Sequence, residues 1–570
     1  MKVYKLTFLL IPLLFWACAN RVPPTGGPKD TDPPKLLGSI PKNGSTNVRT
    51  REITLLFDEQ VVLKNIKKEL LITPRIESDY TYKTKKNTII LNLEEPLDSA
   101  TTYTFNFREG VVDITEGNPA QDLILAFSTG NILDTLQIKG QVTDLFTEKP
   151  QEDVIVGLYV ATDTLDLFNS PPYYLAQTNK QGEYTFRNLK ASSYKIFAFD
   201  DKNNNLTCQS DRESYAFLDS LIVLDSNYVA RPLRLQTLNV DTLQLKRTRS
   251  SGHYFYVIPN KGLVSATIKA ANDSTLWYSY GEGRKEIKLY NTFPINDSLL
   301  VNLSMTDSIY QTSIDSFYLS FPETQRSYDP YEAKVTNLIV SPEIKQVRFS
   351  VTATKPILKL LTDSIHIALD TLLQIPFDST WNITPNETST HFDFKNTLPN
   401  VYLDSIGQNT LQTDKSSAKR GFTIPDKQNT KPKSTAVYSL VFPKATFLSI
   451  EKDSSKHSVI QLKPRYSKDF GILAGSITTD KPHFTVQLLT KDYKVVDEKI
   501  DPGKSYKFTY VDPGDYFLRI LIDENNNGRW DPGNILRDEL PEPIFIYKDS
   551  EGTSKTTIRA NWELTFDLSF

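Results

Sequence analysis

The stretch Thr102-Tyr103-Thr104-Phe105-Asn106-Phe107 alternates polar and aromatic residues. Successive side chains of a β-strand point to opposite faces of a sheet, so the aromatic rings share one face and the polar groups share the other. Such a strand suits an antiparallel sheet that buries one face against a core. The stretch therefore predicts a half-buried strand.

The same kind of pattern extends along the whole chain. Residues 53–57 and 88–93 are two further strand candidates, and Gly, Pro, Asn and Asp separate such runs. No long window carries the sustained apolar stripe of an amphipathic helix. Many short strands at this spacing predict an all-β fold of serial antiparallel β-sandwiches.

Composition excludes several classes of protein. The 570 residues include 65 Lys and Arg against 68 Asp and Glu, which gives a formal net charge of -3. No field of a single sign is therefore available to hold nucleic acid. With 2 Cys, the chain can build neither a disulfide framework nor a four-thiolate metal site. The length suits about four domains.

The N-terminus has the features of a secretory signal. Lys2 and Lys5 give it a positive start, and residues 6–16 form an apolar run that is too short to cross a bilayer. A small residue then precedes Cys18. This arrangement resembles a bacterial lipobox, although the two positions before the small residue depart from the common pattern. The resemblance implies cleavage before Cys18 and lipidation of its thiol; the alternative is an ordinary secretory signal with an incidental cysteine.

A lipid on Cys18 would link the chain to a membrane, because several acyl chains on one residue anchor a protein stably. Residues 1–17 are then a lipoprotein signal peptide, and residues 18–32, rich in Pro and Gly, are a tether. We expect a Gram-negative outer-membrane lipoprotein. No acidic cluster directly follows Cys18, so the sequence leaves open whether the protein faces the periplasm or the cell surface.

The first predicted domain covers residues 33–130. The segments that characterise it are 32–34, 39–48, 53–59, 71–74, 103–107 and 127–130. Together they resemble the bacterial Ig-like domain that is named after an S-layer protein. The resemblance implies an extracytoplasmic β-sandwich that serves as a spacer or adhesion module and carries no catalytic residues.

Two later regions have matching patterns. Residues 134–235 include a Gly182 turn that leads into an aromatic strand, and they resemble the prealbumin-like sandwich of carboxypeptidase regulatory domains. In residues 470–570, Gly475-Ser476-Ile477-Thr478 matches Gly140-Gln141-Val142-Thr143, and both regions end in Asp-x-Asn-x-Asn. Chance is a poor explanation for two such copies. We therefore predict two prealbumin-like sandwiches, which the resemblance implies to be structural or binding modules.

The region between the two copies is less regular. Residues 236–330 alternate well enough to predict a β domain, in which Asn-Asp-Ser and Thr-Asp-Ser triplets serve as turns. Residues 331–468 predict a further β-sandwich. A polar insert at about 405–435 interrupts it and is typical of a loop or linker.

The Asp-x-Asn-x-Asn end of the second copy has the spacing of a calcium loop, with glycine at its sixth position. The candidate ligands are Asp523, Asn525, Asn527, the backbone carbonyl of Arg529, and Asp531. The twelfth position is Asn534 where a Glu is expected, so Asp538 or Glu539 would have to reach back. The alternative is a metal-free turn in which side chains cap the backbone. In the first copy, which starts at Asp201, Leu206 replaces the glycine.

No catalytic signature appears in the chain. No two of the five His are spaced as a ligand pair, and no nucleophile elbow, zinc-protease motif or phosphate loop is present. We therefore assign no catalytic residues. Tyrosine pairs near 173–174, 278–280 and 328–331 lie in turn-rich contexts where exposed rings could bind glycan or protein; the alternative is packing across strands.

These observations predict a non-enzymatic, lipid-anchored envelope protein that acts as a multi-domain interaction scaffold. One form of such a scaffold is an accessory subunit of an outer-membrane complex. Its expected partners are the membrane, through Cys18, and envelope proteins or glycans, but not nucleic acid. Calcium is the one cofactor that the residues suggest. A cell-surface adhesin or glycan-binding protein is the main alternative, and a divergent hydrolase accessory is a third.

Overall fold

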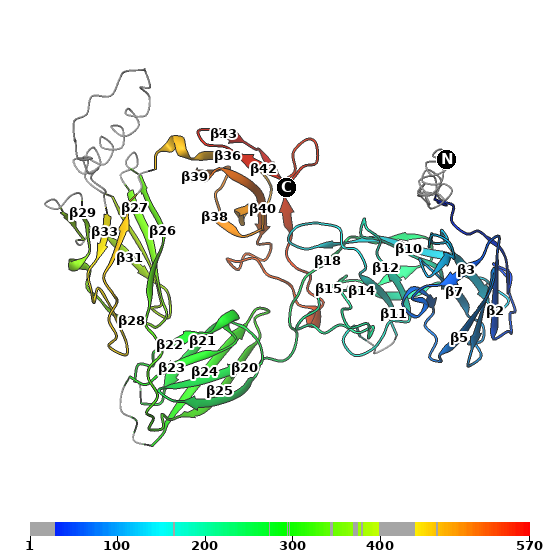
Figure 1. Cartoon of the computed structure of the whole chain (residues 1–570), viewed down its shortest axis with the longest axis horizontal. Coiled ribbons are helices and arrows are strands. Elements are labelled where there is room, and N and C mark those ends of the chain that lie inside the picture. Colours follow the sequence, from blue (N-terminus) through cyan, green and yellow to red (C-terminus); the bar gives the residue numbers. More distant parts are fainter. Residues whose placement is uncertain are drawn as a thin grey trace, which may run out of the picture. The chain divides into compact units, whose positions relative to one another are not determined.

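The computed structural model describes residues 29–162, 166–272, 274–292, 295, 297–341, 346–368, 374–377, 380–397, 439–462 and 465–570. Strands make up nearly all of the regular structure in these residues (Figure 1), which confirms the all-β prediction. No helix in the described ranges has the length and apolar content to span a membrane. Cys18 and the insert predicted at about 405–435 lie outside the described residues.

Two compact units make up the chain. One unit runs to Val142 and also holds Pro150–Thr207 and Ser220–Leu233. The other holds Thr143–Lys149, Cys208–Asp219 and Arg234–Phe570. The chain therefore passes between the two units several times within the segment 134–235.

The first unit begins with a sandwich of antiparallel strands. One sheet has the order β1 (Leu36–Ile40), β2 (Glu52–Phe57), β6 (Thr88–Leu93) and β5 (Tyr80–Lys85). The other has the order β4 (Leu71–Thr73), β7 (Thr102–Asn106) and β9 (Ile124–Ser128), with β3 (Val61–Leu63) paired to β8 (Val111–Asp113) and one helical turn, α2 (Ile66–Glu69). Both sheets contribute to a single apolar core.

The opening stretch forms β7, and its aromatic face is buried as predicted. Phe105 is fully buried and stacks on Phe127, with ring centroids 5.6 Å apart. The prediction of a half-buried strand is wrong for the polar face, because Thr102 and Thr104 are buried as well. Thr104 Oγ1 lies 3.3 Å from the side-chain oxygen of Asn188, so the next sandwich covers this face.

The rest of the first unit contains most of residues 134–235, the segment predicted as the first copy of the repeat. Its strands are β13 (Glu183–Leu189), β10 (Leu136–Asp144) and β17 (Tyr228–Val229) in one sheet, and β12 (Tyr174–Gln177), β11 (Ile155–Val160), β14 (Ser192–Phe199) and β16 (Ile222–Leu224) in the other. β10 and β17 are parallel, whereas β10 and β13 are antiparallel. Two short strands, β15 (Tyr215–Phe217) and β18 (Leu233–Leu235), complete this segment of the sequence.

The C-terminal copy has the same strand order. One sheet holds β39 (Ser505–Val511), β36 (Gly471–Thr478) and β43 (Glu563–Thr565), with β44 (Leu568–Ser569) also paired to β36. The other holds β38 (Val495–Ile500), β37 (Phe484–Thr490), β40 (Gly514–Ile522), β41 (Ile544–Ile546) and β42 (Thr556–Ile558), with the short helices η4 (Ser467–Asp469) and η5 (Ile535–Arg537) nearby in sequence. β36 and β43 are parallel, as β10 and β17 are. The two copies therefore share this strand order.

Two more sandwiches lie between the copies in sequence. One contains β19 (Leu245–Ser251), β20 (Tyr254–Pro259), β23 (Ile287–Tyr290) and β22 (Tyr278–Tyr280) opposite β21 (Leu263–Ala270), β24 (Leu299–Asp307) and β25 (Thr312–Leu319), with the short helix η2 (Glu282–Arg284). Phe255 stacks on Phe317 in its core, with ring centroids 5.3 Å apart. We call it the third sandwich.

The fourth sandwich follows directly. One sheet has the order β26 (Ala333–Ser341), β27 (Gln346–Ala353), β32 (His391–Thr397) and β31 (Asn382–Pro385). A second has the order β30 (Gln374–Pro376), β29 (His366–Ala368), β33 (Ser439–Phe442) and β35 (Ser458–Gln461). In addition, β28 (Ile357–Leu360) pairs with β34 (Phe447–Ser449), and the short helix η3 spans Thr362–Ser364. Phe349 is central to its core and stacks on Phe394 at 4.6 Å. Each sandwich thus buries aromatic rings on its inner faces.

Candidate functional site

The loop predicted to bind calcium follows β40, and its side chains fold back onto its own backbone. The carboxylate of Asp523 accepts hydrogen bonds from the N–H groups of Asn527 (3.2 Å) and Gly528 (2.8 Å). The side-chain oxygen of Asn525 also accepts from Asn527 N–H (3.0 Å), and that of Asn527 accepts from Arg529 N–H (3.1 Å). Gly528 has a φ of 86°, which favours glycine. These residues form consecutive Asx turns.

Asp531 closes the loop. One of its carboxylate oxygens accepts from the side-chain amides of Asn525 (2.7 Å) and Asn527 (2.6 Å), and the other accepts from Arg529 Nε (3.0 Å). Burial raises the pKa of Asp531, but the hydrogen bonds from Asn525, Arg529 and Asn527 lower it overall. The guanidinium of Arg529 also covers the ring of Tyr310 at 3.4 Å. The structure thus brings the predicted ligands Asn525, Asn527 and Asp531 together.

Glu542 is a member of this site that sequence reasoning missed. Its Oε1 accepts from the N–H groups of Glu524 (2.9 Å) and Asn525 (3.1 Å), and its Oε2 accepts from Asp531 N–H (2.8 Å). Trp530 Nε1 donates to the Glu542 carbonyl oxygen (2.9 Å). Glu542 lies beyond the twelve positions of a calcium loop, so its spacing offered no signal. The carboxylate that accepts hydrogen bonds from the loop is therefore that of Glu542, not that of Asp538 or Glu539 as the sequence suggested.

The first copy forms the same turn. Asp201 accepts from the N–H groups of Asn205 (3.1 Å) and Leu206 (2.9 Å), and Asn203 Oδ1 accepts from Asn205 N–H (3.0 Å). Leu206 has a φ of 62° where the second copy has glycine. In the described residues, no group of three or more His, Cys, Asp or Glu side chains is arranged to hold a metal. Calcium binding at either loop stays a prediction.

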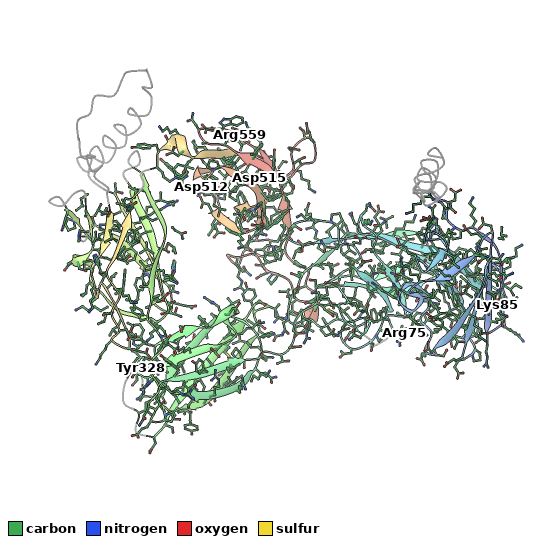
Figure 2. The ribbon with its side chains drawn as sticks, viewed as in Figure 1. Arg75, Lys85, Tyr328, Asp512, Asp515 and Arg559 are labelled. Atoms are coloured by element: carbon green, nitrogen blue, oxygen red, sulfur yellow. The ribbon has the colours of Figure 1, made fainter. Side chains whose placement is uncertain are left out.

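A groove in the first unit lies between its N-terminal sandwich and the first copy of the repeat. One part has a volume of about 630 Å³ and combines apolar residues such as Ile72 with charged residues such as Arg75, Arg108 and Asp201. A more polar part of about 310 Å³ shares Arg108 with it. The backbone N–H of Arg75, a residue labelled in Figure 2, donates to the carbonyl oxygen of Tyr173 (2.8 Å) at this junction. Two sandwiches form the groove together, so no local sequence pattern indicates it.

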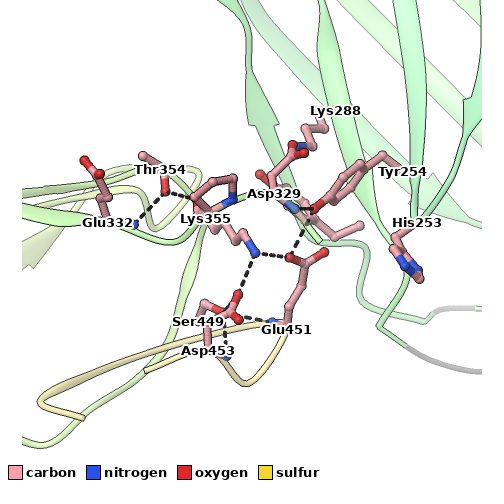
Figure 3. A network of polar contacts seen from close by, with 12 residues as sticks. His253, Tyr254, Lys288, Asp329, Glu332, Thr354, Lys355, Ser449, Glu451 and Asp453 are labelled. Atoms are coloured by element: carbon pink, nitrogen blue, oxygen red, sulfur yellow. Dashed lines mark hydrogen bonds and ion pairs between the residues drawn. The ribbon is translucent and has the colours of Figure 1, made fainter. Parts of the chain in front are cut away.

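The third and fourth sandwiches meet at a buried lysine. Lys355, between β27 and β28, places its Nζ 2.5 Å from Glu451 Oε2 and 2.5 Å from Asp453 Oδ2 (Figure 3). Tyr254 of β20 donates to Glu451 Oε2 (3.4 Å), and Asp329 N–H donates to Tyr254 Oη (2.8 Å). Polar contacts therefore run from one sandwich into the other. Sequence reasoning did not single out any of these residues.

Apolar residues support the same junction and a second one. Ile450 packs in a cluster with Tyr254 and Tyr290 of the third sandwich. Elsewhere in the second unit, Leu145 packs against Ile544 and Ile546 of the C-terminal copy. A ring contact between Phe146 and Trp530, with centroids 5.5 Å apart, and a hydrogen bond from Gln236 Nε2 to the Pro532 carbonyl oxygen (2.7 Å) lie beside that cluster.

The predicted tyrosine pairs mostly pack against other rings. Tyr174 is buried, and Tyr278 and Tyr280 are half-buried in a T-shaped contact with centroids 5.6 Å apart. Tyr328, labelled in Figure 2, is exposed but stacks on His253 at 3.8 Å. Packing between rings is therefore the better account of these residues than a continuous aromatic binding surface.

Comparison with known proteins identifies one part of the chain. Residues 30–129 match the bacterial Ig-like domain family. The structural comparison includes BcpA, the major pilin subunit of Bacillus cereus, at 9% identity and a TM-score of 0.13, covering 76% of this chain and 99% of that chain. It also includes domains 1-6 of surface layer protein SbsC, at 10% identity and a TM-score of 0.13, covering 94% and 67%.

A third similar structure is a DUF3823 family protein from Bacteroides ovatus ATCC 8483, at 13% identity and a TM-score of 0.11, covering 33% of this chain and 100% of that chain. A comparison with curated proteins finds no match. At such TM-scores the structural likenesses carry no weight for function. The bacterial Ig-like domain is therefore the part of the chain with an assigned family.

Proposed function

We propose that this protein is a non-enzymatic, lipid-anchored scaffold of the bacterial cell envelope, in which serial β-sandwiches hold interaction surfaces at fixed spacing. The observation that carries the proposal is the packing between neighbouring sandwiches. In the first unit, Thr104 contacts Asn188 and Arg75 contacts Tyr173; in the second, Tyr254 contacts Glu451. Fixed junctions keep distant binding surfaces preorganised, which lowers the entropic cost of binding a partner.

Two further observations support the envelope location. The bacterial Ig-like domain at residues 30–129 is a module expected outside the cytoplasm. The sequence before it resembles a lipoprotein signal that ends at Cys18, and acyl chains at that position would tether the sandwiches to the outer membrane. The groove lined by Ile72, Arg75 and Arg108 offers both apolar and charged contacts to a partner.

The anchor is tested by metabolic labelling with a fatty acid. The wild-type protein is expected to incorporate the label and to sediment with outer membranes. Cys18→Ser is expected to lose both properties, whereas Cys208→Ser, a substitution at the buried second cysteine, should keep them. Labelling that persists in Cys18→Ser would rule out the proposed anchor.

The scaffold role is tested by crosslinking in native membranes followed by identification of the proteins that co-purify with the full chain. We expect a stoichiometric envelope partner that is recovered less well from Arg75→Glu, a charge reversal in the groove. Recovery of the chain alone would contradict the scaffold role. Cleavage of the chain by protease added to intact cells would place it on the surface and favour the adhesin instead.

A further inference from the structure

Lys355 is buried beside two carboxylates rather than one. Its side chain is 1% exposed, and that of Glu451 is 2% exposed. Nζ lies 2.5 Å from Glu451 Oε2 and 2.5 Å from Asp453 Oδ2, so the three side chains converge on one point (Figure 3). The hydroxyl of Ser449 also donates to Asp453 Oδ2 (3.3 Å), which draws electron density from that carboxyl group.

The second carboxylate is incompletely satisfied. Glu451 Oε1 is buried and has no hydrogen-bond partner in the described part of the chain. One ammonium and two carboxylates leave an excess negative charge at the site, and burying an unpaired charge is costly. Glu451 Oε2 lies 2.5 Å from Nζ of Lys355, which is within the reach that proton transfer needs. The geometry therefore supplies a group that can accept a proton directly from Lys355.

A second buried lysine shows what a purely structural ion pair looks like in this protein. Lys261 lies 2.5 Å from Asp307, but it also donates to the backbone carbonyl oxygens of Asn239 (3.1 Å) and Asp241 (2.5 Å). Gln311 Oε1 (3.3 Å) is a fourth acceptor, so four acceptors surround the ammonium of Lys261 and only one of them is a carboxylate. Among the described residues, the hydrogen bonds of Lys355 go to carboxylates alone.

We propose that Lys355 and Asp453 join in an intramolecular isopeptide bond, with Glu451 as the group that transfers protons. Lys355 gives one proton to Glu451, and its freed lone pair attacks Cγ of Asp453. The C–N bond forms and one Cγ–O bond breaks. The proton on Glu451 and a second proton from Nζ leave on the departing oxygen as water. Atoms and charge balance, Glu451 is regenerated, and no oxidant or other reactant is needed.

Proximity and burial favour this reaction. Nζ and the carboxyl group are already in contact, which replaces an encounter between separate molecules by a step within one fold. Burial lowers the pKa of Lys355, but its hydrogen bonds to Asp453 and Glu451 raise it overall, so the ammonium is the resting form and Glu451 has to take its proton. The product amide replaces the buried Lys355 ammonium and the partly exposed Asp453 carboxylate by a neutral group, which removes the desolvation cost of the buried ammonium.

The bond would fasten the chain at the junction of two sandwiches. Asp453 follows Lys355 by 98 residues, and Glu451 contacts Tyr254 of the third sandwich. A covalent link between residues that far apart restricts the unfolded chain, as a disulfide over a long loop does. The fourth sandwich would then resist unfolding under force, which suits an envelope protein but does not depend on the proposed scaffold role.

The test is peptide mapping of the full chain by tandem mass spectrometry after denaturation and proteolysis. We expect a branched peptide that contains Lys355 and Asp453 and weighs one water less than the two linear peptides together. Lys355→Arg should yield linear peptides only, and Glu451→Gln should abolish or greatly slow the linkage. Lys261→Arg is the matched control, because it alters a buried lysine elsewhere and should leave the branched peptide intact.

One variant identifies the acyl partner. Asp453→Asn would release ammonia instead of water, so its branched peptide should have the same mass as that of the wild type. Wild-type protein that yields only the linear peptides would overturn the proposal, and this result needs no variant to fold. A branched peptide that persists in Lys355→Arg, or one that forms at the wild-type rate in Glu451→Gln, would overturn the assigned roles.

Discussion

Lys261 and Asp307 form an ion pair inside the third sandwich. Nζ lies 2.5 Å from Oδ2, and the two side chains are 4% and 1% exposed. The other oxygen of Asp307 accepts from the N–H groups of Ile309 (3.0 Å) and Gln311 (2.8 Å), which holds the turn between β24 and β25. The pair therefore connects the start of β21 with the end of β24.

We predict that Asp307→Asn destabilises the third sandwich by about 3–5 kcal/mol, because it leaves the Lys261 ammonium buried without its counter-ion. Hydrogen exchange of peptides from β21 and β24 in the full chain would report the loss. Asp297→Asn, at an exposed position between β23 and β24, is the control and should change little. Equal protection in the two variants would mean that the pair does not stabilise this sandwich.

Local patterns were sufficient to locate many strands. Alternation at residues 88–93 corresponds to β6 (Thr88–Leu93), and the opening stretch corresponds to β7 (Thr102–Asn106). The repeated residues around Gly140 and Gly475 lie in β10 and β36, each of which pairs with an antiparallel strand and with a parallel strand. These successes share a cause, since strand periodicity and turn residues act over a few positions.

The candidate sites were harder to predict because they join residues that are distant in sequence. Lys355 and Asp453 are 98 residues apart, and Glu542 enters a loop that starts at Asp523. With 68 acidic residues in the chain, no local feature distinguishes Glu451 or Glu542 from solvated carboxylates. The buried polar face of β7 was missed for the same reason, because a separate sandwich covers Thr104.

The glycines that characterise the repeat lead to a second prediction. A Cβ on Gly475 would lie 1.8 Å from the carbonyl oxygen of Phe566, and one on Gly140 would lie 2.3 Å from the hydroxyl of Tyr184. Gly475→Ala should cost at least about 1–3 kcal/mol, because backbone has to move. Thermal unfolding would measure it. Gly38→Ala, which meets nothing within 4 Å, is the control and should unfold as the wild type does.

A third prediction concerns acid stability of the Ig-like sandwich. The carboxylate of Asp113 accepts from the N–H groups of Glu116 (2.7 Å), Gly117 (2.9 Å) and Asn118 (3.0 Å). Burial raises the pKa of Asp113, but these bonds, with one from the Thr115 hydroxyl, lower it well below the ordinary value of 3.8. A lowered folded-state pKa stabilises the fold above the ordinary value, and this contribution is lost as the pH falls towards the folded-state pKa.

Asp113→Asn should therefore destabilise this sandwich at neutral pH, and the difference from the wild type should shrink as the pH falls below about 4. Urea unfolding followed by hydrogen exchange in β7 and β9 at several pH values would show this trend. Asp122→Asn is a useful control, since Asp122 is an exposed acidic residue of the same sandwich. A difference that does not change with pH would contradict the role assigned to the ionised carboxylate.

The fourth prediction concerns calcium at the loop after β40. If Asp523 and Asn525 turn from backbone N–H groups to a cation, and Asp531 turns to it from its side-chain donors, Ca²⁺ would bind the folded C-terminal copy and not the unfolded chain. Calcium at about ten times its Kd would then add about 1.4 kcal/mol of stability. Loops of this kind in extracellular modules bind at about 10⁻⁴–10⁻³ M, so millimolar calcium is the appropriate range.

We expect a higher Tm for the full chain in millimolar Ca²⁺ than in chelator, and no such difference in Asp523→Ala. Asp549→Ala is the matched control: its carboxylate caps the N–H groups of Glu551 (3.0 Å) and Thr553 (2.8 Å) in another turn of the same copy. That variant should lower the Tm and keep the calcium effect. A Tm that does not respond to calcium, or a response that survives Asp523→Ala, would identify the loop as a metal-free turn whose side chains serve only to cap its backbone.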